Sequence, residues 1–206
     1  MTNIIILVGK SASGKDTLLK DLLKENAILK PIISNTTRPI RPSETQGIEY
    51  NFVSEEEFNT YQYIEKRKYN TLVENVPATW YYGTPTTAIE LFKSNFYIGI
   101  LDLKGLEKLK EYLQSIFSQQ EEYRREVKLI SIYLYVEDSE RTLRAKKRKG
   151  FDETEWNRRL ADDNIVFSQA REICDYGVEN LDYQYTKNYC KKIIKNINEK
   201  ETLNGL

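Results

Sequence analysis

Apolar runs alternate with amphipathic segments along most of the chain. The runs are short and rich in β-branched residues, which is typical of buried parallel strands. The segments between them repeat apolar residues every three or four positions, which is typical of helices that cover a sheet. This pattern predicts an α/β fold with a parallel sheet covered on both faces, in which the strand that contains Pro31 is short or lies at an edge. The predicted strands are Asn3–Val8, Leu29–Ile33, Phe96–Asp102, Val127–Val136 and Tyr176–Val178, and the predicted helices are Thr17–Asn26, Lys104–Phe117, Thr154–Ala170 and Tyr185–Ile197.

The region Ser34–Thr84 departs from this alternation. Arg, Pro, Tyr and Gly become frequent there and apolar runs disappear, which predicts an inserted, partly exposed subdomain. Within it, Ser54 and a glutamate three residues later form a capping-box pattern for a short helix through Phe58 and Tyr61. Farther along the chain, Gln119–Arg125 is expected to be a charged, solvated continuation of a helix or a loop.

The composition narrows the classes of function. The 206 residues suffice for one packed domain with inserted subdomains. The 31 basic and 31 acidic side chains balance, so the protein has no net charge that would attract it to nucleic acid or to an anionic membrane. The longest apolar run, Ile4–Val8, is far shorter than a membrane span and no signal-peptide layout precedes it, so we expect a cytoplasmic protein. Cys174 and Cys190 lack metal-ligand spacing and are expected to be reduced thiols. The absence of histidine excludes Ser-His-Asp and Cys-His catalysis.

The turn after the first predicted strand is a candidate phosphate site. Residues 9–15, GKSASGK, have the G-x-x-x-x-G-K spacing of a phosphate-binding loop and lie between a strand and a helix. In such a loop, backbone N–H groups and the helix N-terminus cradle nucleotide phosphates, and Lys15 reaches the β- and γ-phosphate oxygens. The alternative is a glycine turn that binds nothing. The candidate ATP-binding residues are Gly9, Ser11, Ala12, Ser13, Gly14, Lys15, Asp16 and Thr17.

The segment Ser34–Phe58 carries the most specific pattern. It reads SNTTRPIRPSETQGIEYNFVSEEEF and resembles the GMP-binding segment of guanylate kinases, T-T-R-x-x-R-x-x-E-x-x-G-x-x-Y-x-F-V. YYGTP at Tyr81–Pro85 and the strand that ends in ILD at Asp102 resemble further guanylate-kinase segments in the same order. With the phosphate loop, the lid and VENLD at residues 178–182, the resemblance spans nearly the whole chain. The matching positions of the first segment are Thr36, Thr37, Arg38, Arg41, Glu44, Gly47, Tyr50, Phe52 and Val53.

Arg38 and Arg41 fit the acceptor phosphate that this resemblance implies. A nucleoside monophosphate carries about two negative charges near neutral pH. Two arginines three residues apart, each followed by a proline, offer bidentate donors to such a group. Alone, the pair would indicate no more than surface charge, and the surrounding pattern favours the phosphate. By resemblance, the hydroxyls of Tyr50 and Tyr82 bind the same phosphate.

Recognition of guanine requires an acceptor for its N1–H and amine groups. A buried carboxylate supplies one, and adenine, which lacks the N1 proton, would leave it unpaired, so the two bases can be discriminated by roughly 10⁴-fold or more. By resemblance, the carboxylate is Glu65, and Ser34 and Thr84 are the hydroxyls at the base edge. The stretch after Glu65 is longer than in familiar guanylate kinases, so Glu74 remains an alternative.

Two acidic residues are candidate metal ligands. Asp16 occupies the position at which many phosphate loops have the Ser or Thr that coordinates magnesium; because magnesium readily keeps waters, Asp16 can hold it directly or through water. Asp102 closes a strand at the edge where ligands bind in open parallel sheets, and the resemblance implies contact with GMP or the metal. Guanylate kinases usually have a second acid two residues later, where this chain has Lys104. We expect Asp16 to replace part of that charge.

The stretch 141–150 contains six basic residues. Alone, it would indicate a nucleic-acid-binding patch, but the balanced net charge and the position after the fourth strand favour a resemblance to the kinase lid, whose arginines close over the ATP phosphates. Asp138 or Ser139 is expected to cap the helix that enters it. The residues that match the lid arginines are Arg144, Arg148 and Arg159, with Lys149 as an alternative to Arg148, and Asn180 resembles the asparagine that contacts adenine or is a turn residue.

These observations predict an ATP-dependent guanylate kinase that uses Mg²⁺ and converts GMP or dGMP to the diphosphate. The expected architecture is a P-loop core (1–33, 85–138 and 171–206), a nucleoside-monophosphate-binding (NMP-binding) subdomain (34–84) and a helical basic lid (139–170). The alternatives are a kinase of different or broader base specificity and a non-catalytic guanylate-kinase-like domain that binds phosphorylated proteins. We expect small-molecule partners only, no membrane or nucleic acid, and a monomer or homodimer.

Overall fold

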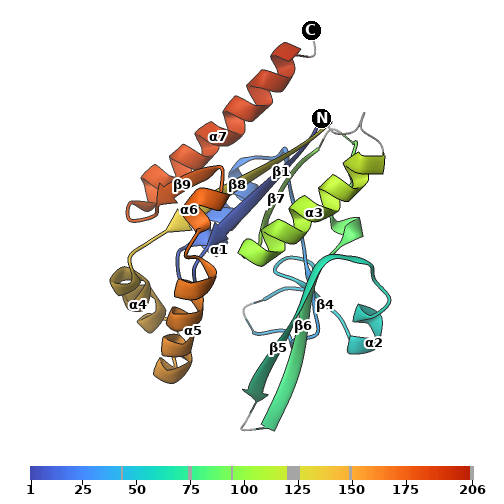
Figure 1. Ribbon diagram of the computed structural model, residues 1–206. Helices are drawn as coiled ribbons and strands as arrows, with labels where there is room; N and C mark the ends of the chain where they lie inside the picture. Colours follow the sequence, from blue (N-terminus) through green and yellow to red (C-terminus); the bar gives the residue numbers. More distant parts are fainter. Residues whose placement is uncertain (43, 74–75, 94, 120–125, 149, 205–206) are drawn as a thin grey trace.

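The larger sheet of the computed structural model is entirely parallel and has the strand order β2-β7-β1-β8-β9. Helices flank both of its faces (Figure 1), which confirms the predicted α/β fold. The structure describes residues 1–206 except 43, 74–75, 94, 120–125, 149 and 205–206. The strands are β1 (Thr2–Gly9), β2 (Leu29–Pro31), β7 (Phe96–Ile100), β8 (Val127–Tyr135) and β9 (Tyr176–Glu179), and β2 lies at an edge, as predicted from Pro31.

Alternate residues of β1 bury against opposite helical layers. Ile5 and Leu7 pack in one cluster with Leu18 of α1 and with residues of α7, whereas Ile4 and Ile6 pack in a second cluster with α3 and α6. This follows from the two-residue period of a strand. The helices are α1 (Lys15–Glu25), α3 (Leu103–Gln119), α6 (Ala170–Ile173) and α7 (Tyr183–Asn204), and a 3₁₀ turn, η1, spans Thr86–Ala88. The predicted continuation 119–125 lies outside the described residues, apart from Gln119 at the end of α3.

The predicted insertion contains a second sheet that the sequence pattern did not indicate. Its order is β4-β3-β6-β5, with β3 (Asn35–Thr36), β4 (Asn51–Phe52), β5 (Tyr63–Val73) and β6 (Val76–Pro85). The short helix α2 (Glu55–Phe58) has the predicted cap, in which Glu57 N–H donates to Ser54 Oγ at 3.0 Å. It does not extend to Tyr61, because the chain turns after the buried Phe58, whose ring stacks on Tyr63.

The segment predicted to be the lid contains α4 (Asp138–Lys146) and α5 (Glu153–Val166). The prediction of one helix over Thr154–Ala170 is wrong: the buried Phe167 ends α5 and stacks on Tyr133, and α6 begins three residues later. The predicted cap is also wrong. Glu137 occupies the N-cap position of α4, and Asp138 instead accepts a hydrogen bond from Arg141 at 2.6 Å. Among the described residues, no helix has the length and hydrophobicity to cross a membrane.

Candidate active site

The phosphate loop connects β1 to α1 at the carboxyl edge of the larger sheet. Ala12 and Gly14 have left-handed backbone, with φ of 59° and 95°. A Cβ on Gly14 would lie 2.4 Å from Asn180 Nδ2, so this position requires glycine. Asn180 Nδ2 donates to the Ser13 carbonyl at 2.7 Å, which places Asn180 against the loop. Within the described part of the chain, Ser13 Oγ and Asn180 Oδ1 are buried without hydrogen-bond partners, as expected where a polar ligand binds.

Lys15 begins α1 and folds back over the loop. Its ammonium group donates to the Lys10 carbonyl at 3.1 Å. Burial lowers the pKa of Lys15, and the charges of Asp16 and Asp163 oppose this shift. The charge of Arg148 also acts on Lys15 and lowers the pKa further. The predicted lid residue Arg148 follows α4 (Asp138–Lys146) with an exposed side chain, and its positive charge is felt at the loop lysine.

Arg144 reaches the phosphate loop from α4. Its Nη2 donates to the Asn180 carbonyl at 2.7 Å and its Nε to Glu140 at 2.8 Å. Arg159 lies on α5, is 45% exposed and donates to Glu155 at 2.8 Å. Arg144 thus contacts the phosphate loop, whereas Arg159 is held at the surface of α5 by the Glu155 carboxylate. Lys149, the alternative to Arg148, lies outside the described residues.

Arg141 is a fully buried lid residue that sequence reasoning missed. Its Nε donates to the Ser11 carbonyl at 2.7 Å, and its two terminal nitrogens bond Asp138 and Asp163. Asp163 also accepts the Ser11 N–H at 2.8 Å. The guanidinium lies 5.6 Å from the ring centroid of Trp156. Arg141 and Asp163 therefore fix one backbone unit of the phosphate loop between α4 and α5. The i, i+3 spacing from Asp138 was the only local signal of this role.

The predicted acceptor-phosphate residues lie on β6 of the second sheet and in the loop between β3 and β4. Arg38 is 4% exposed and forms a bidentate pair with Glu44, at 3.0 and 2.8 Å. Glu44 also accepts the backbone N–H of Arg41 at 2.9 Å, so it fixes both arginines of the motif, although the Arg41 side chain is exposed. Tyr50 and Tyr82 meet edge to face at 5.7 Å, and Arg38 Cζ lies 5.8 Å from the Tyr50 ring centroid.

Ser34, Glu65 and Thr84 form one chain of hydrogen bonds. Thr84 donates both its N–H and its hydroxyl to Glu65 Oε1, at 3.1 and 2.9 Å. Because the single Thr84 hydroxyl proton is used there, Ser34 must be the donor in the 2.9 Å contact between the two hydroxyls. Burial raises the pKa of Glu65. The three predicted base-edge residues thus lie together, and the alternative Glu74 lies outside the described residues.

Asp102 contacts a residue that the sequence did not single out. Its carboxylate accepts from Arg67 of β5 and, at 2.8 Å, from the Gly105 N–H in the first turn of α3. Lys104, where guanylate kinases usually have an acid, is exposed in the same turn, and Asp16 is exposed in the first turn of α1. The described residues contain no group of three or more Asp, Glu, Cys or His side chains arranged to hold a metal.

The β5–β6 hairpin also reaches the lid. The Tyr69 hydroxyl donates to Glu155 at 3.0 Å and accepts from Arg158 Nη2 at 2.8 Å. Arg158 Cζ lies 5.6 Å from the Tyr69 ring centroid. Glu155 binds Arg158 and Arg159 as well, and these hydrogen bonds lower its pKa to about 2. The Glu155 carboxylate therefore joins the hairpin to Arg159, one of the predicted lid arginines.

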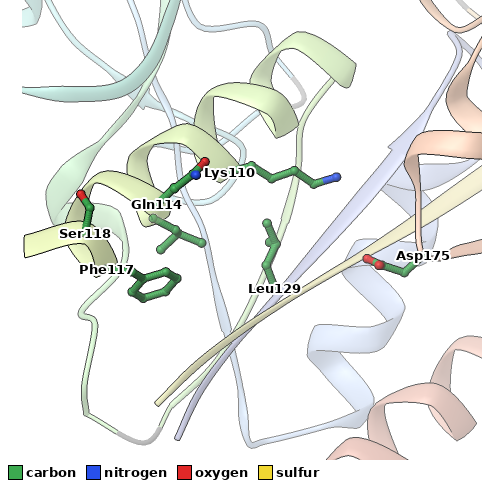
Figure 2. Close-up of a pocket in the computed structure, with 7 residues that line it drawn as sticks. Lys110, Gln114, Phe117, Ser118, Leu129 and Asp175 are labelled. Atoms are coloured by element: carbon green, nitrogen blue, oxygen red, sulfur yellow. The ribbon is translucent and has the colours of Figure 1, made fainter. Parts of the chain in front are cut away.

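A separate cavity of about 640 Å³ lies beside α3 (Figure 2). Its lining includes the apolar side chains Leu113, Phe117 and Leu129. Both charged residues of its lining are engaged within the protein: Lys110 donates to the Ile173 carbonyl, and Asp175 accepts from Ser131. None of the predicted site residues lines it, so the candidate active site remains between the phosphate loop, the second sheet and the lid.

A phosphate loop after the first strand of a parallel sheet, an inserted sheet with paired arginines and a basic two-helix lid define the class of P-loop nucleoside monophosphate kinases. Residues 1–197 match the family model described as guanylate kinase. The guanylate kinase of Helicobacter pylori is 30% identical over 197 residues, which cover 95% of this chain and 87% of the relative. This chain therefore belongs to the guanylate kinase family.

Two further comparisons differ in the share of the chain that they cover. The guanylate kinase of Clostridioides difficile is 35% identical over 113 residues, so this match spans 52% of each chain. The solved guanylate kinase of Anaplasma phagocytophilum has a TM-score of 0.58 at 22% identity and is matched over 94% of this chain and 85% of that one. The structural match shows the fold, including the parallel sheet flanked by helices.

Proposed function

We propose that this protein is a guanylate kinase that transfers the γ-phosphoryl group of ATP to GMP or dGMP. The observation that carries the proposal is the hydrogen-bonded chain of Ser34, Thr84 and Glu65 in a member of the guanylate kinase family, with Arg38 in the loop after β3 of the same subdomain. The core comprises 1–33, 85–138 and 171–206, the NMP-binding subdomain 34–84 and the lid 139–170. We infer a monomer or homodimer that takes only small-molecule substrates.

Glu65 reads the guanine edge. Both hydrogen bonds that the Glu65 side chain accepts from Thr84 end on Oε1, so Oε2 accepts from the N1–H and amine of the base. Ser34 donates to Thr84 and keeps lone pairs for a second donor of the base. Adenine has no N1 proton and would leave the half-buried carboxylate unpaired, which costs binding energy.

The two phosphates meet between the loop and the second sheet. Arg38, Arg41, Tyr50 and Tyr82 bind the acceptor phosphate, and Lys15 with the loop N–H groups binds the donor. The lid supplies Arg144, Arg148 and Arg159, which neutralise the charge of the transferring group. No general base is required, because the acceptor phosphate is already an anion. The closed lid also excludes water and so limits ATP hydrolysis.

The acidic residues at the site fit a magnesium ion carried mainly by phosphates and water. Such an ion needs only one or two protein carboxylates. Asp16 offers an exposed carboxylate beside Lys15, whereas the carboxylate of Asp102 is paired with Arg67. We therefore propose Asp16 as the principal ligand, directly or through water. Mg²⁺ supplies charge neutralisation at the β- and γ-phosphate oxygens when it is bound.

The proposal is tested by ADP release with MgATP and a panel of GMP, dGMP, AMP, CMP, UMP and dTMP. We expect turnover confined to GMP and dGMP, and we expect Glu65→Gln to lose that preference while Glu57→Gln, an exposed glutamate of the same subdomain, retains it. Turnover with several bases would refute the guanine site around Glu65. A folded protein that binds GMP without turnover would refute the kinase and favour a non-catalytic binding domain.

A further inference from the structure

One face of the β5–β6 hairpin carries the predicted GMP residues and one additional charged residue. Glu65 pairs across the hairpin with Thr84, and Arg67 pairs with Tyr82. Side chains two residues apart on a strand share a face, and directly paired residues of antiparallel strands lie side by side on it. Arg67 therefore lies in one row with three residues proposed to bind GMP, at the level of the phosphate ligand Tyr82.

The contacts of Arg67 agree with this position. Its Cζ lies 5.8 Å from the Tyr82 ring centroid, and that ring meets Tyr50 edge to face. Burial raises the pKa of Tyr50, and the positive charge of Arg67 opposes this rise more strongly than that of Arg38 does. Two guanidinium groups thus lie beside the tyrosine pair, Arg38 buried and Arg67 53% exposed.

We propose that Arg67 is a third arginine of the acceptor-phosphate site. This inference rests on the proposed function, since it assigns Arg67 to the phosphate of the bound nucleoside monophosphate. The partner of Arg67 in the structure is Asp102, in an ion pair whose side chains are 53% and 27% exposed. Partly exposed ion pairs contribute little stability, so a dianionic phosphate readily replaces Asp102 as the partner of the guanidinium. Arg67 pairs with Tyr82, a proposed phosphate ligand, whereas Glu65 pairs with Thr84 at the proposed base edge. Arg67 therefore binds the phosphate rather than the base.

The experiment compares the affinities of GMP and guanosine by calorimetry in the wild type and in Arg67→Ala. Hydrogen bonds to a charged phosphate predict a loss of GMP affinity of about tenfold to hundredfold, with guanosine affinity unchanged. Arg67→Lys, which keeps the charge, should recover part of the loss. Lys68→Ala is the matched control, because Lys68 is exposed on the same strand, pairs with Tyr81 and faces the other side.

Equal losses for GMP and guanosine would overturn the proposal and indicate a structural role, and unchanged GMP affinity would overturn it as well. Melting temperatures identify any variant that fails to fold, in which case Arg67→Lys carries the comparison. The outcome is separable from the proposed function. If the wild type does not phosphorylate GMP, the proposed kinase activity is refuted. If, in that case, Arg67→Ala still lowers the preference for GMP over guanosine, the role of Arg67 in phosphate binding is supported.

Discussion

Replacement of Tyr69 by phenylalanine removes one hydroxyl from the contact between the hairpin and the lid. That hydroxyl bonds Glu155 and Arg158, at 3.0 and 2.8 Å, and through Glu155 it is connected to Arg159. The ring remains to stack on Trp80 and to contact the Arg158 guanidinium. The change therefore weakens the contact between the hairpin and α5 and leaves the hydrogen bonds of Glu65 and Arg38 in place.

The partners of Tyr69 are partly exposed, which limits the effect. The side chains of Glu155 and Arg158 are 37% and 45% exposed. Shielded hydrogen bonds to charged groups contribute about 1.5–3 kcal/mol, and exposed ion pairs about 0–1 kcal/mol, so each bond here contributes about 0.5–1 kcal/mol. Together they favour closure by about 1–2 kcal/mol, which corresponds to about a 5–30-fold change in the ratio of closed to open protein.

Steady-state kinetics with GMP and MgATP measure this effect. We expect kcat/KM to fall about 5–30-fold in Tyr69→Phe, because transfer requires the closed lid. Tyr61→Phe is the control, since it removes a tyrosine hydroxyl of the same subdomain that bonds only the nearby Glu57 among the described residues. A Tyr69→Phe enzyme within twofold of both the wild type and this control would refute the reasoning.

Three further predictions concern the lid and the loop. Arg141→Met leaves Asp163 and the Ser11 carbonyl without their buried partner, so we expect the free energy of unfolding to fall by about 3–5 kcal/mol in urea titrations, whereas the exposed Lys146→Met should change it by less than about 0.5 kcal/mol. Lys15→Met should lower kcat by about 10²–10³-fold, and a loss below tenfold would contradict its role at the phosphates. The folded-state pKa of Glu155 is about 2, below the usual 4.5, so its stabilising contribution is complete above pH 4.5 and is lost as the pH falls toward 2. Glu155→Gln should flatten the stability profile over that window, and an unchanged profile would disprove this contribution.

The larger sheet could be predicted from sequence because its central strands β1 and β7 are buried on both faces. Strands such as β1 are continuously apolar, and that pattern places them within one or two residues of their observed bounds. The second sheet could not be predicted in this way. In β5 the run Lys66, Arg67 and Lys68 has no apolar period, because all three side chains are exposed. The strands β3 and β5 of the second sheet are both paired with β6, and no local pattern of apolar residues marks them.

Some residues of the candidate site could likewise be predicted from sequence and others could not. Ser34, Arg38 and Thr84 belong to contiguous motifs, so the resemblance could indicate them directly. Arg67 and Arg141 could not be found in that way, because their roles depend on partners far along the chain. Asp102 is 35 residues from Arg67, and Ser11 is 130 residues from Arg141. Only the fold brings these groups together.

The alternating row on β5 also constrains how this hairpin can change in length. Insertion of one residue between Glu65 and Tyr69 would turn Tyr69 to the opposite face, away from Glu155. Insertion of two residues would keep the face but carry the hydroxyl about 6.6 Å farther along the strand, past its lid partners. The number of residues between Glu65 and Tyr69 therefore sets the distance between Glu65 and the point at which the hairpin contacts α5.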